Sequence, residues 1–449
     1  MKTDRRKPHL GHTLALAAAL SLCAAPEAAS QYKVLHNFTG GPPDGVGTTA
    51  GVVLDQMGNL YGASGSGGPG SCPGGCGVVW ELTPRPLGDW NFDTVYDFQG
   101  KNDGDYANRN VILDTLGNLY GTTFGGGAHH AGTAFELTPG SGAWTLNTLF
   151  AFCPKPGCSD QGGSESGLTR DNLGNLYGTK IDAVYELTQE SSSWKEVMLH
   201  RFCAKGPPCN DGSGPYASLI LDATGNLYAT TSYGGTGCGG DGCGTVYELS
   251  PDSGGKWRET ILHHFDNIGG DGVSPGGAAL LMDSAGNLYG TTEAGGAYTG
   301  CAGVSDRPRS GPVGLAVAAR PSPLVSEGNC GTVFKLTRAR CGRWKERILH
   351  NFAPGAGGYL PGAGVVMDKS GNLYGTTDGG GNASGCGVLY KLAPTAKDKW
   401  KYSVLHTFGN GYDGCLPSGN LAIDSNGNLY GGTIFGGTYG YGVVFELTP

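Results

Sequence analysis

Short apolar runs separated by glycine-rich turns recur along the chain from about residue 31 onward. One unit starts with the apolar run ASLILD at Ala217, then the turn ATGN and a second run, LYATT. A long polar loop leads to a third run, GTVYELS at Gly244, and to a fourth run, KWRETILHHF at Lys256. Each run has the length and the Val, Ile, Thr and aromatic content of a β-strand, and breaker residues bound it. The pattern predicts four antiparallel strands per unit.

Two phrases in this unit repeat seven times each. The turn phrase Asp-x-x-Gly-Asn-Leu-Tyr begins at Asp55, Asp114, Asp171, Asp222, Asp283, Asp368 and Asp424. The third run begins at Gly77, Gly132, Asp182, Gly244, Gly331, Gly387 and Gly442. Four short strands at a period of roughly sixty residues are typical of a propeller blade. We therefore expect an all-β, seven-bladed β-propeller with four antiparallel strands per blade.

The two ends of the sequence predict how the ring closes. The chain stops at Pro449, directly after the third run of the seventh unit, so that unit has no fourth run of its own. The segment YKVLHNF, Tyr32 to Phe38, matches the fourth runs WKERILHNF and WKYSVLHTF. We expect residues 31–38 to complete the last blade, and residues 31–449 to form a single propeller, because closure removes exposed sheet edges.

The repeated aspartate is interpreted as a turn residue. Its carboxylate is expected to cap the hairpin between the first two strands, while the glycine supplies a left-handed residue. Calcium binding is the alternative, but one carboxylate per turn provides too few oxygen ligands.

The repeat phrases also resemble a known family. GNLYGTT, LHNF and third runs such as GVVFELTP are similar to the tandem repeats of the GloVer-type family of exported bacterial proteins, over nearly all of residues 31–449. The phrase DxxGNLY is similar, more weakly, to turns of NHL-type propellers. The family resemblance implies no particular activity.

The first thirty residues have the features of a secretory signal peptide. A basic start is followed by the apolar run Leu14 to Ala25 and by the small residues Ala28-Ala29-Ser30. The mature protein is therefore predicted to be secreted or periplasmic.

Fourteen cysteines suit an oxidising compartment. Their positions predict six disulfides, namely Cys72–Cys76, Cys153–Cys158, Cys203–Cys209, Cys238–Cys243, Cys301–Cys330 and Cys386–Cys415. The last pair joins two different loops, which requires both loops to lie on one face. Cys341 is expected to be a free thiol on the opposite face. Because Cys-x-x-Cys is absent, we predict neither a zinc ribbon nor redox chemistry, and no cofactor or metal.

The formal net charge of −8 argues against nucleic acid or an anionic membrane as a partner. No later segment is long and apolar enough to span a membrane. We expect a monomer.

Five histidines occupy equivalent positions in the fourth runs: His36, His200, His263, His350 and His406, with Tyr96 and Phe150 in the other two units. A ring of histidines suggests a metal site, but outer strands of different blades are not expected to converge. We interpret these histidines as structural residues, and the tryptophans of the fourth runs as packing residues between blades.

Loops that leave the fourth strand and loops between the second and third strands are predicted to share one face. This face carries Asp44, Asp103, Asp160, Asp211, Asp271 and Asp413, with Tyr216, Tyr359 and Tyr412 nearby. We expect an acidic funnel at the channel mouth that binds a sugar or a cation; the alternative is ordinary Asp-Gly turn chemistry. An insertion at residues 300–329 in blade five, with Arg307, Arg309 and Arg320, is either a specificity element or a tethered disordered excursion.

No G-x-S-x-G, HExxH or P-loop signature is present. The sequence therefore favours a non-catalytic binding module for a glycan or a cell-surface partner. The alternatives are an extracellular polysaccharide hydrolase or lyase that uses carboxylates at the channel mouth, and a structural protein without a small ligand.

Overall fold

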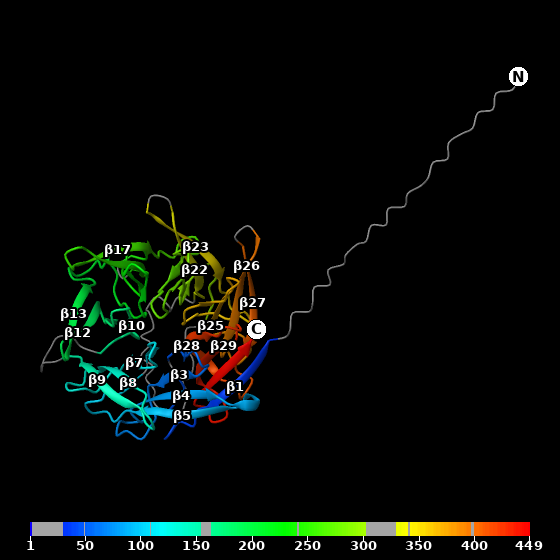
Figure 1. The fold of residues 1–449 in the computed structure, drawn as a ribbon. Coiled ribbons are helices and arrows are strands. Elements are labelled where there is room, and N and C mark those ends of the chain that lie inside the picture. Colours follow the sequence, from blue (N-terminus) through cyan, green and yellow to red (C-terminus); the bar gives the residue numbers. More distant parts are fainter. Residues whose placement is uncertain are drawn as a thin grey trace.

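The computed structural model describes residue 1 and residues 30–449, except positions 49, 108, 154–162, 240–241, 302–328, 340–341 and 397–398. Seven four-stranded antiparallel sheets follow one another around a ring, and each forms one blade (Figure 1). This arrangement confirms the predicted seven-bladed propeller. The described part of the chain contains the short 3-10 turn η1 (Pro86–Gly88).

The blades are built from strands in chain order. Blade one contains β2 (Val53–Leu54), β3 (Leu60–Ser64), β4 (Val78–Pro84) and β5 (Trp90–Asp97). Blade two contains β6 (Ile112–Leu113), β7 (Leu119–Thr122), β8 (Thr133–Thr138) and β9 (Thr145–Ala151). Blade three contains β10 (Thr169–Arg170), β11 (Leu176–Lys180), β12 (Ala183–Glu190) and β13 (Ser193–Arg201). Blade four contains β14 (Ile220–Leu221), β15 (Leu227–Thr231), β16 (Thr245–Pro251) and β17 (Trp257–His264). Blade five contains β19 (Leu281–Met282), β20 (Leu288–Thr292), β22 (Thr332–Arg338) and β23 (Trp344–Asn351). Blade six contains β24 (Val366–Met367), β25 (Leu373–Thr377), β26 (Val388–Pro394) and β27 (Trp400–Thr407).

Blade seven joins the two ends of the folded chain. Its strands are β28 (Cys415–Ile423), β29 (Leu429–Phe435), β30 (Val443–Thr448) and, outermost, β1 (Gln31–Asn37). β1 pairs antiparallel with β30, from Gln31 opposite Thr448 to Asn37 opposite Val443. Figure 1 shows the blue first strand beside the red last strand. The predicted closure by the N-terminal strand is therefore confirmed.

The repeated turn has the structure predicted for it, as the Asp222 turn shows. Its Oδ1 accepts hydrogen bonds from the backbone N–H groups of Thr224 at 2.8 Å and Asn226 at 2.9 Å. Its Oδ2 accepts from the Asn226 side chain at 2.9 Å and from the Tyr228 hydroxyl at 3.0 Å. Gly225 has φ +87°, in the left-handed region that favours glycine. The two backbone bonds recur in all seven turns.

The core lies between neighbouring blades. Large rings from the third strands, among them Trp80, Tyr185 and Tyr247, are fully buried there. The Trp80 ring crosses the second strand at Gly62, where an added Cβ would lie 2.2 Å from the ring. A glycine is required at this position because any side chain would collide with the ring.

Tryptophans of the fourth strands pack across the blade boundary, as predicted. Trp144 contacts Tyr61 of the preceding blade with ring centroids 6.1 Å apart, and Trp257 contacts Tyr177 in the same way at 6.2 Å. These edge-to-face contacts add to the burial that joins one blade to the next.

The first strands surround the axis of the ring, and small or amide residues in or just before them contact one another across blades. The backbone N–H of Gly51 donates to Asn110 Oδ1 of the next blade at 2.6 Å, and Gly364 donates to Asn420 Oδ1 at 3.0 Å. Glycine allows this close approach of neighbouring blades.

Loops after the fourth strand and loops between the second and third strands lie together, on a side that we call the loop face. Single bridges pair Ser213 with Tyr233 and Tyr359 with Gly379. In blade five, β18 (Gly272–Val273) and β21 (Ala294–Gly295) form a short ladder of the same kind. The predicted sharing of one face is therefore confirmed.

The disulfides Cys72–Cys76, Cys203–Cys209, Cys238–Cys243, Cys301–Cys330 and Cys386–Cys415 are formed as predicted. Cys153 is also disulfide-bonded, but its predicted partner Cys158 lies outside the described residues, as does Cys341. Among the described residues, no helix is long and apolar enough to cross a membrane. The predicted signal peptide and most of the 300–329 insertion fall outside the described part of the chain, so both remain predictions.

The closing strand makes a testable contribution to stability. Phe38, the residue directly after β1, is fully buried, whereas Lys33 within β1 is exposed. We expect Phe38→Ala to lower the free energy of unfolding by about 3–5 kcal/mol, and Lys33→Ala to change it by less than about 0.5 kcal/mol. Thermal and denaturant unfolding of both variants tests this, and an unchanged melting temperature for Phe38→Ala would contradict closure by β1.

The turn makes a second prediction. Gly225→Val forces a β-branched residue into the left-handed region and should destabilise the protein by about 1–3 kcal/mol. Ala223→Val, two positions earlier in the same turn, is the matched control, because Ala223 is exposed and is not among the left-handed residues. Circular dichroism melting curves compare the two; an equal loss for both would refute the conformational argument.

Candidate functional site

The described aspartates of the loop face cap their own loops. Asp44 accepts hydrogen bonds from the Thr39 N–H at 3.0 Å and from the Thr39 hydroxyl at 2.6 Å. Asp413 accepts from the N–H groups of Gly409 at 3.1 Å and Asn410 at 2.9 Å. Asp103, Asp211 and Asp271 accept equivalent backbone bonds from Gln99, Cys203 and Asp266. These bonds are the Asp-Gly turn chemistry that the sequence left open as the alternative; Asp160 lies outside the described residues.

The same aspartates contact the outermost strand of their own blade. His36 Nε2 lies 3.0 Å from Asp44 Oδ2, His406 Nε2 lies 3.0 Å from Asp413 Oδ2, and the Tyr96 hydroxyl donates to Asp103 at 3.1 Å. Because the fourth strands form the outer rim of the ring (Figure 1), these aspartates are spread around that rim. The structure does not bring them together at the channel mouth, where the sequence analysis expected an acidic funnel.

Hydrogen bonds lower the pKa values of two of these carboxylates, Asp44 and Asp413. Burial alone would raise the pKa of Asp44, but the bonds from His36 and Thr39 outweigh it and lower the pKa below its ordinary value. The pKa of Asp413 is lowered in the same way, with the His406 bond opposing burial.

A one-residue bulge aims each fourth-strand histidine at the next blade. In β1 the pairing passes from Val34 directly to His36, which leaves Leu35 without a partner residue. Corresponding shifts occur in β13 and β17, directly before His200 and His263. A bulge bends the strand and re-aims the side chains that follow it.

Three of the aimed histidines stack on an aromatic ring of the following blade. His36 lies on Phe92 with ring centroids 4.0 Å apart, His350 on Tyr402 at 4.0 Å, and His406 on Tyr32 at 3.9 Å. The sequence argument that outer-strand residues of different blades do not converge is therefore wrong for neighbouring blades, because it took no account of the bulge.

Two histidines face a glutamate instead of an aromatic ring. His200 Nε2 lies 3.8 Å from Asp211 Oδ2 and 3.6 Å from Glu259 Oε2 of the next blade. His263 Nε2 lies 3.5 Å from Asp271 Oδ2 and 3.6 Å from Glu346 Oε2. In each group the three candidate ligand atoms lie within 4.8 Å of one another. We call these groups, His200–Asp211–Glu259 and His263–Asp271–Glu346, the rim triads.

Burial dominates the electrostatics of the rim triads. It raises the pKa of Glu259 to about 8, and the charge of Asp211 adds to this effect. It also raises the pKa of Glu346 to about 8, although His263 opposes the shift. The Nε2 atoms of His200 and His263 are buried and have no hydrogen-bond partner. Each triad can share a proton or hold a cation.

The sequence analysis missed the rim triads. Their signal is a glutamate two residues after the fourth-strand tryptophan, as in Trp257–Glu259 and Trp344–Glu346, in a blade that follows a histidine-bearing blade. The spacing indicates a contact between the histidine and the glutamate only once the alignment of neighbouring blades is known.

Other buried charges lie beside the inner strands. Arg109, just before β6, forms an ion pair with Glu165, just before β10, with 3.1 Å between Nη2 and Oε2. Burial lowers the pKa of Arg109, while Glu165 opposes this shift. Glu293 follows β20, and burial raises its pKa to about 7. The sequence analysis singled out none of these three residues.

The predicted tyrosines differ in exposure. Tyr216 and Tyr359 are partly buried, whereas the Tyr412 side chain is 72% exposed. Two further loop-face tyrosines that the sequence analysis did not select are also exposed, Tyr298 at 50% and Tyr439 at 58%.

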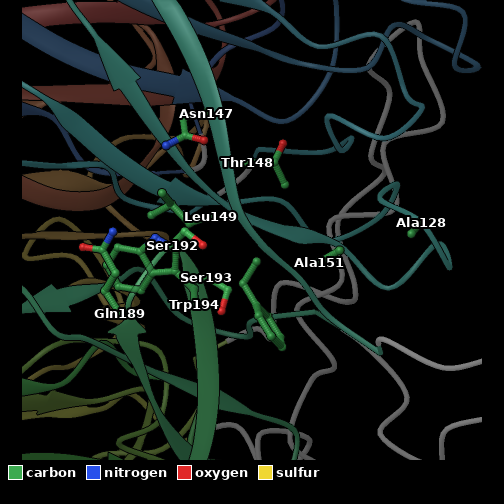
Figure 2. Close-up of a pocket in the computed structure, with 10 residues that line it drawn as sticks. Ala128, Asn147, Thr148, Leu149, Ala151, Gln189, Ser192, Ser193 and Trp194 are labelled. Carbon is green, nitrogen blue, oxygen red and sulfur yellow. The ribbon is translucent and has the colours of Figure 1, made fainter.

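An open groove lies on the outer side of blades two and three, between β9 and the β12–β13 hairpin (Figure 2). Asn147, Thr148, Gln189, Ser193 and Trp194 are among its lining residues. None of the residues that line it is titratable, so the groove provides no acid, base or metal ligand.

The family model for the Gloeobacter/Verrucomicrobia repeat matches residues 23–183 and 324–449, which together make up more than half of the chain. The chain belongs to the Gloeobacter/Verrucomicrobia repeat family. This result confirms the resemblance found in the repeat phrases. Of the rim-triad residues, only Glu346 lies within the matched regions of the repeat family.

Solved structures similar to this repeat-family member are propellers of varied function. Virginiamycin B lyase from Staphylococcus aureus is 12% identical, with 94% of this chain and 99% of the lyase covered and a TM-score of 0.49. The extracellular domain of a putative hybrid two-component system from B. thetaiotaomicron is 14% identical, with 93% of this chain and 41% of that chain covered and a TM-score of 0.50. PorZ, a surface component of the type-IX secretion system of Porphyromonas gingivalis, is 15% identical, with 88% and 46% covered and a TM-score of 0.49. The match with a TM-score of 0.50 shows a shared fold alone. No curated protein sequence matches the chain.

Proposed function

We propose that this protein is an exported, non-catalytic binding module that recognises a glycan through its loop face. The observation that carries the proposal is the exposure of Tyr298, Tyr412 and Tyr439 on that face. A tyrosine offers a flat apolar ring and a hydroxyl group, which suit the apolar face and the hydroxyls of a sugar ring. The disulfides support export because they form and persist in oxidising compartments.

Blade seven provides the best platform for such a ligand. Tyr412 lies in the loop that enters β28, and Tyr439 lies in the loop between β29 and β30 of the same blade. The disulfide Cys386–Cys415 anchors the Tyr412 loop to the neighbouring blade. A loop held in this way loses little conformational entropy when it binds a ligand, which favours affinity.

The hydrolase or lyase alternative receives less support from the geometry. It requires carboxylates that face a substrate at the channel mouth. The described loop-face aspartates instead bind their own loop backbone, and Asp44 and Asp413 also bind rim histidines. Because those bonds occupy the carboxylate oxygens, we favour binding over catalysis.

The proposal is tested by glycan-array binding of the wild-type protein and of the double variant Tyr412→Ala/Tyr439→Ala. We expect the double variant to bind at least about tenfold more weakly to any glycan that the wild-type protein binds on the array, because a few aromatic side chains supply most of the binding energy at an interface. Leu116→Ala is the matched control, since Leu116 is 80% exposed but lies in the Asp114 turn on the opposite side.

Two results would count against this function. If the wild-type protein binds no glycan on the array, or if the double variant binds with the same affinity as the wild type, the tyrosines do not form a glycan-binding site. Release of reducing ends or unsaturated products from a polysaccharide panel would favour the hydrolase or lyase instead.

A further inference from the structure

We propose that the two rim triads are binding sites for first-row divalent transition-metal cations, with Zn²⁺ as the reference ion. Each site would join two neighbouring blades: His200 and Asp211 with Glu259, and His263 and Asp271 with Glu346. One imidazole nitrogen and two carboxylate oxygens form a donor set that such cations accept. This inference does not depend on the proposed glycan binding.

The separations within the triads fit a shared cation better than direct hydrogen bonds. Zinc lies about 2.0–2.2 Å from nitrogen and oxygen ligands, so two tetrahedral ligands are about 3.4 Å apart. The histidine-to-carboxylate separations in the triads are 3.5 to 3.8 Å. These separations exceed the usual length of a hydrogen bond.

The same fold contains two internal controls. Where the next blade offers an aromatic ring, the histidine lies 3.0 Å from its aspartate, as in His36–Asp44 and His406–Asp413. Where the next blade offers a glutamate, the corresponding separation opens to 3.8 Å for His200 and 3.5 Å for His263. The glutamate thus accompanies a wider space between the donors.

Charge balance supplies an independent argument from blade three. Glu196 occupies the position equivalent to Glu259 and Glu346, but the preceding blade has Phe150 in place of the histidine. There Lys180 replaces the threonine found at this point in β15, β20 and β25, and its Nζ lies 2.7 Å from Glu196 Oε1. A lysine thus neutralises this glutamate. Each rim triad instead places two carboxyl groups around one imidazole.

Burial makes two negative charges around one imidazole costly unless a proton or a cation balances them. The Oε1 atoms of Glu259 and Glu346 are buried without a hydrogen-bond partner, and the Nε2 atoms of both histidines lie 3.5 to 3.8 Å from the carboxylates that face them. A buried polar atom without a partner is rare in native proteins and calls for an explanation. A metal ion between the three side chains would satisfy the imidazole nitrogen and balance the negative charge.

The donor set also indicates which class of cation fits. Calcium takes six to eight oxygen ligands, and magnesium usually keeps several waters around one or two carboxylates. Imidazole suits zinc and its neighbours in the first transition series. Three protein ligands leave a fourth position for water.

The test uses the mature chain without a histidine tag, stripped with a chelator and titrated with Zn²⁺ by isothermal calorimetry. We expect two equivalents to bind per chain. Glu259→Gln and Glu346→Gln should each remove one equivalent, because glutamine keeps the shape but is a poor zinc ligand. His36→Gln and His406→Gln, in the rim positions with aromatic partners, should leave the stoichiometry at two.

X-ray absorption of the zinc-loaded wild-type protein keeps the test decisive if a variant fails to fold. Imidazole scattering with further oxygen ligands and without sulfur supports the proposal. Sulfur ligands, an absence of stoichiometric binding, or two equivalents retained by both glutamine variants would overturn it. In the last two cases a shared proton would account for the triads.

Discussion

The pairing of β1 with β30 is the contact on which the rest of the molecule depends. A blade buries its faces against its two neighbours, so an open row of blades would leave two apolar faces and two sheet edges in water. The bonds between Gln31–Asn37 and Val443–Thr448 join residues more than four hundred positions apart. With the ring closed, every third-strand aromatic has a neighbouring blade to pack against, and the inner glycines can approach one another around the axis.

Closure makes the junctions between blades at the outer rim similar to one another, and the chain fills six of the seven in three different ways. Three junctions stack a histidine on an aromatic ring. One balances Glu196 with Lys180. Two bring a histidine and two carboxylates together. The backbone geometry is repeated, but the chemistry at each junction depends on one residue in each of two successive blades.

Features governed by local sequence or by chain order could be predicted. All the residues that form the turn, such as Asp222 and Gly225, lie within a few positions of one another, so the repeated turn phrase alone predicts the turn. Closure followed from the match between Tyr32–Phe38 and the other fourth runs. The Cys386–Cys415 pair followed from the absence of a closer partner and from the winding of a propeller blade.

Features that depend on how far a loop residue lies from the axis, or on contacts between two blades, could not be predicted. Asp44 and Asp413 follow the fourth strands by several residues, but each folds back to accept hydrogen bonds from the first residues of its loop and to contact a rim histidine. The contact of His200 with Glu259 requires both the bulge after Met198 and the stagger of two blades, and neither is written in a local phrase. A sequence pattern gives the spacing of residues along the chain, whereas these contacts depend on the direction in which a side chain points from one blade toward the next.

The rim and the loop face are physically connected through the aspartates. Asp271 faces His263 on the rim, and it also accepts hydrogen bonds from the Asp266 N–H at 2.9 Å and the Gly272 N–H at 2.6 Å. Gly272 begins the ladder of β18 with β21, which holds two loop-face segments of blade five together. The charge held at this rim triad therefore acts on the carboxylate that shapes the loop. A cation at this triad would bind the same carboxylate that accepts these two backbone hydrogen bonds, so the occupancy of the rim bears on the carboxylate that organises this part of the loop face.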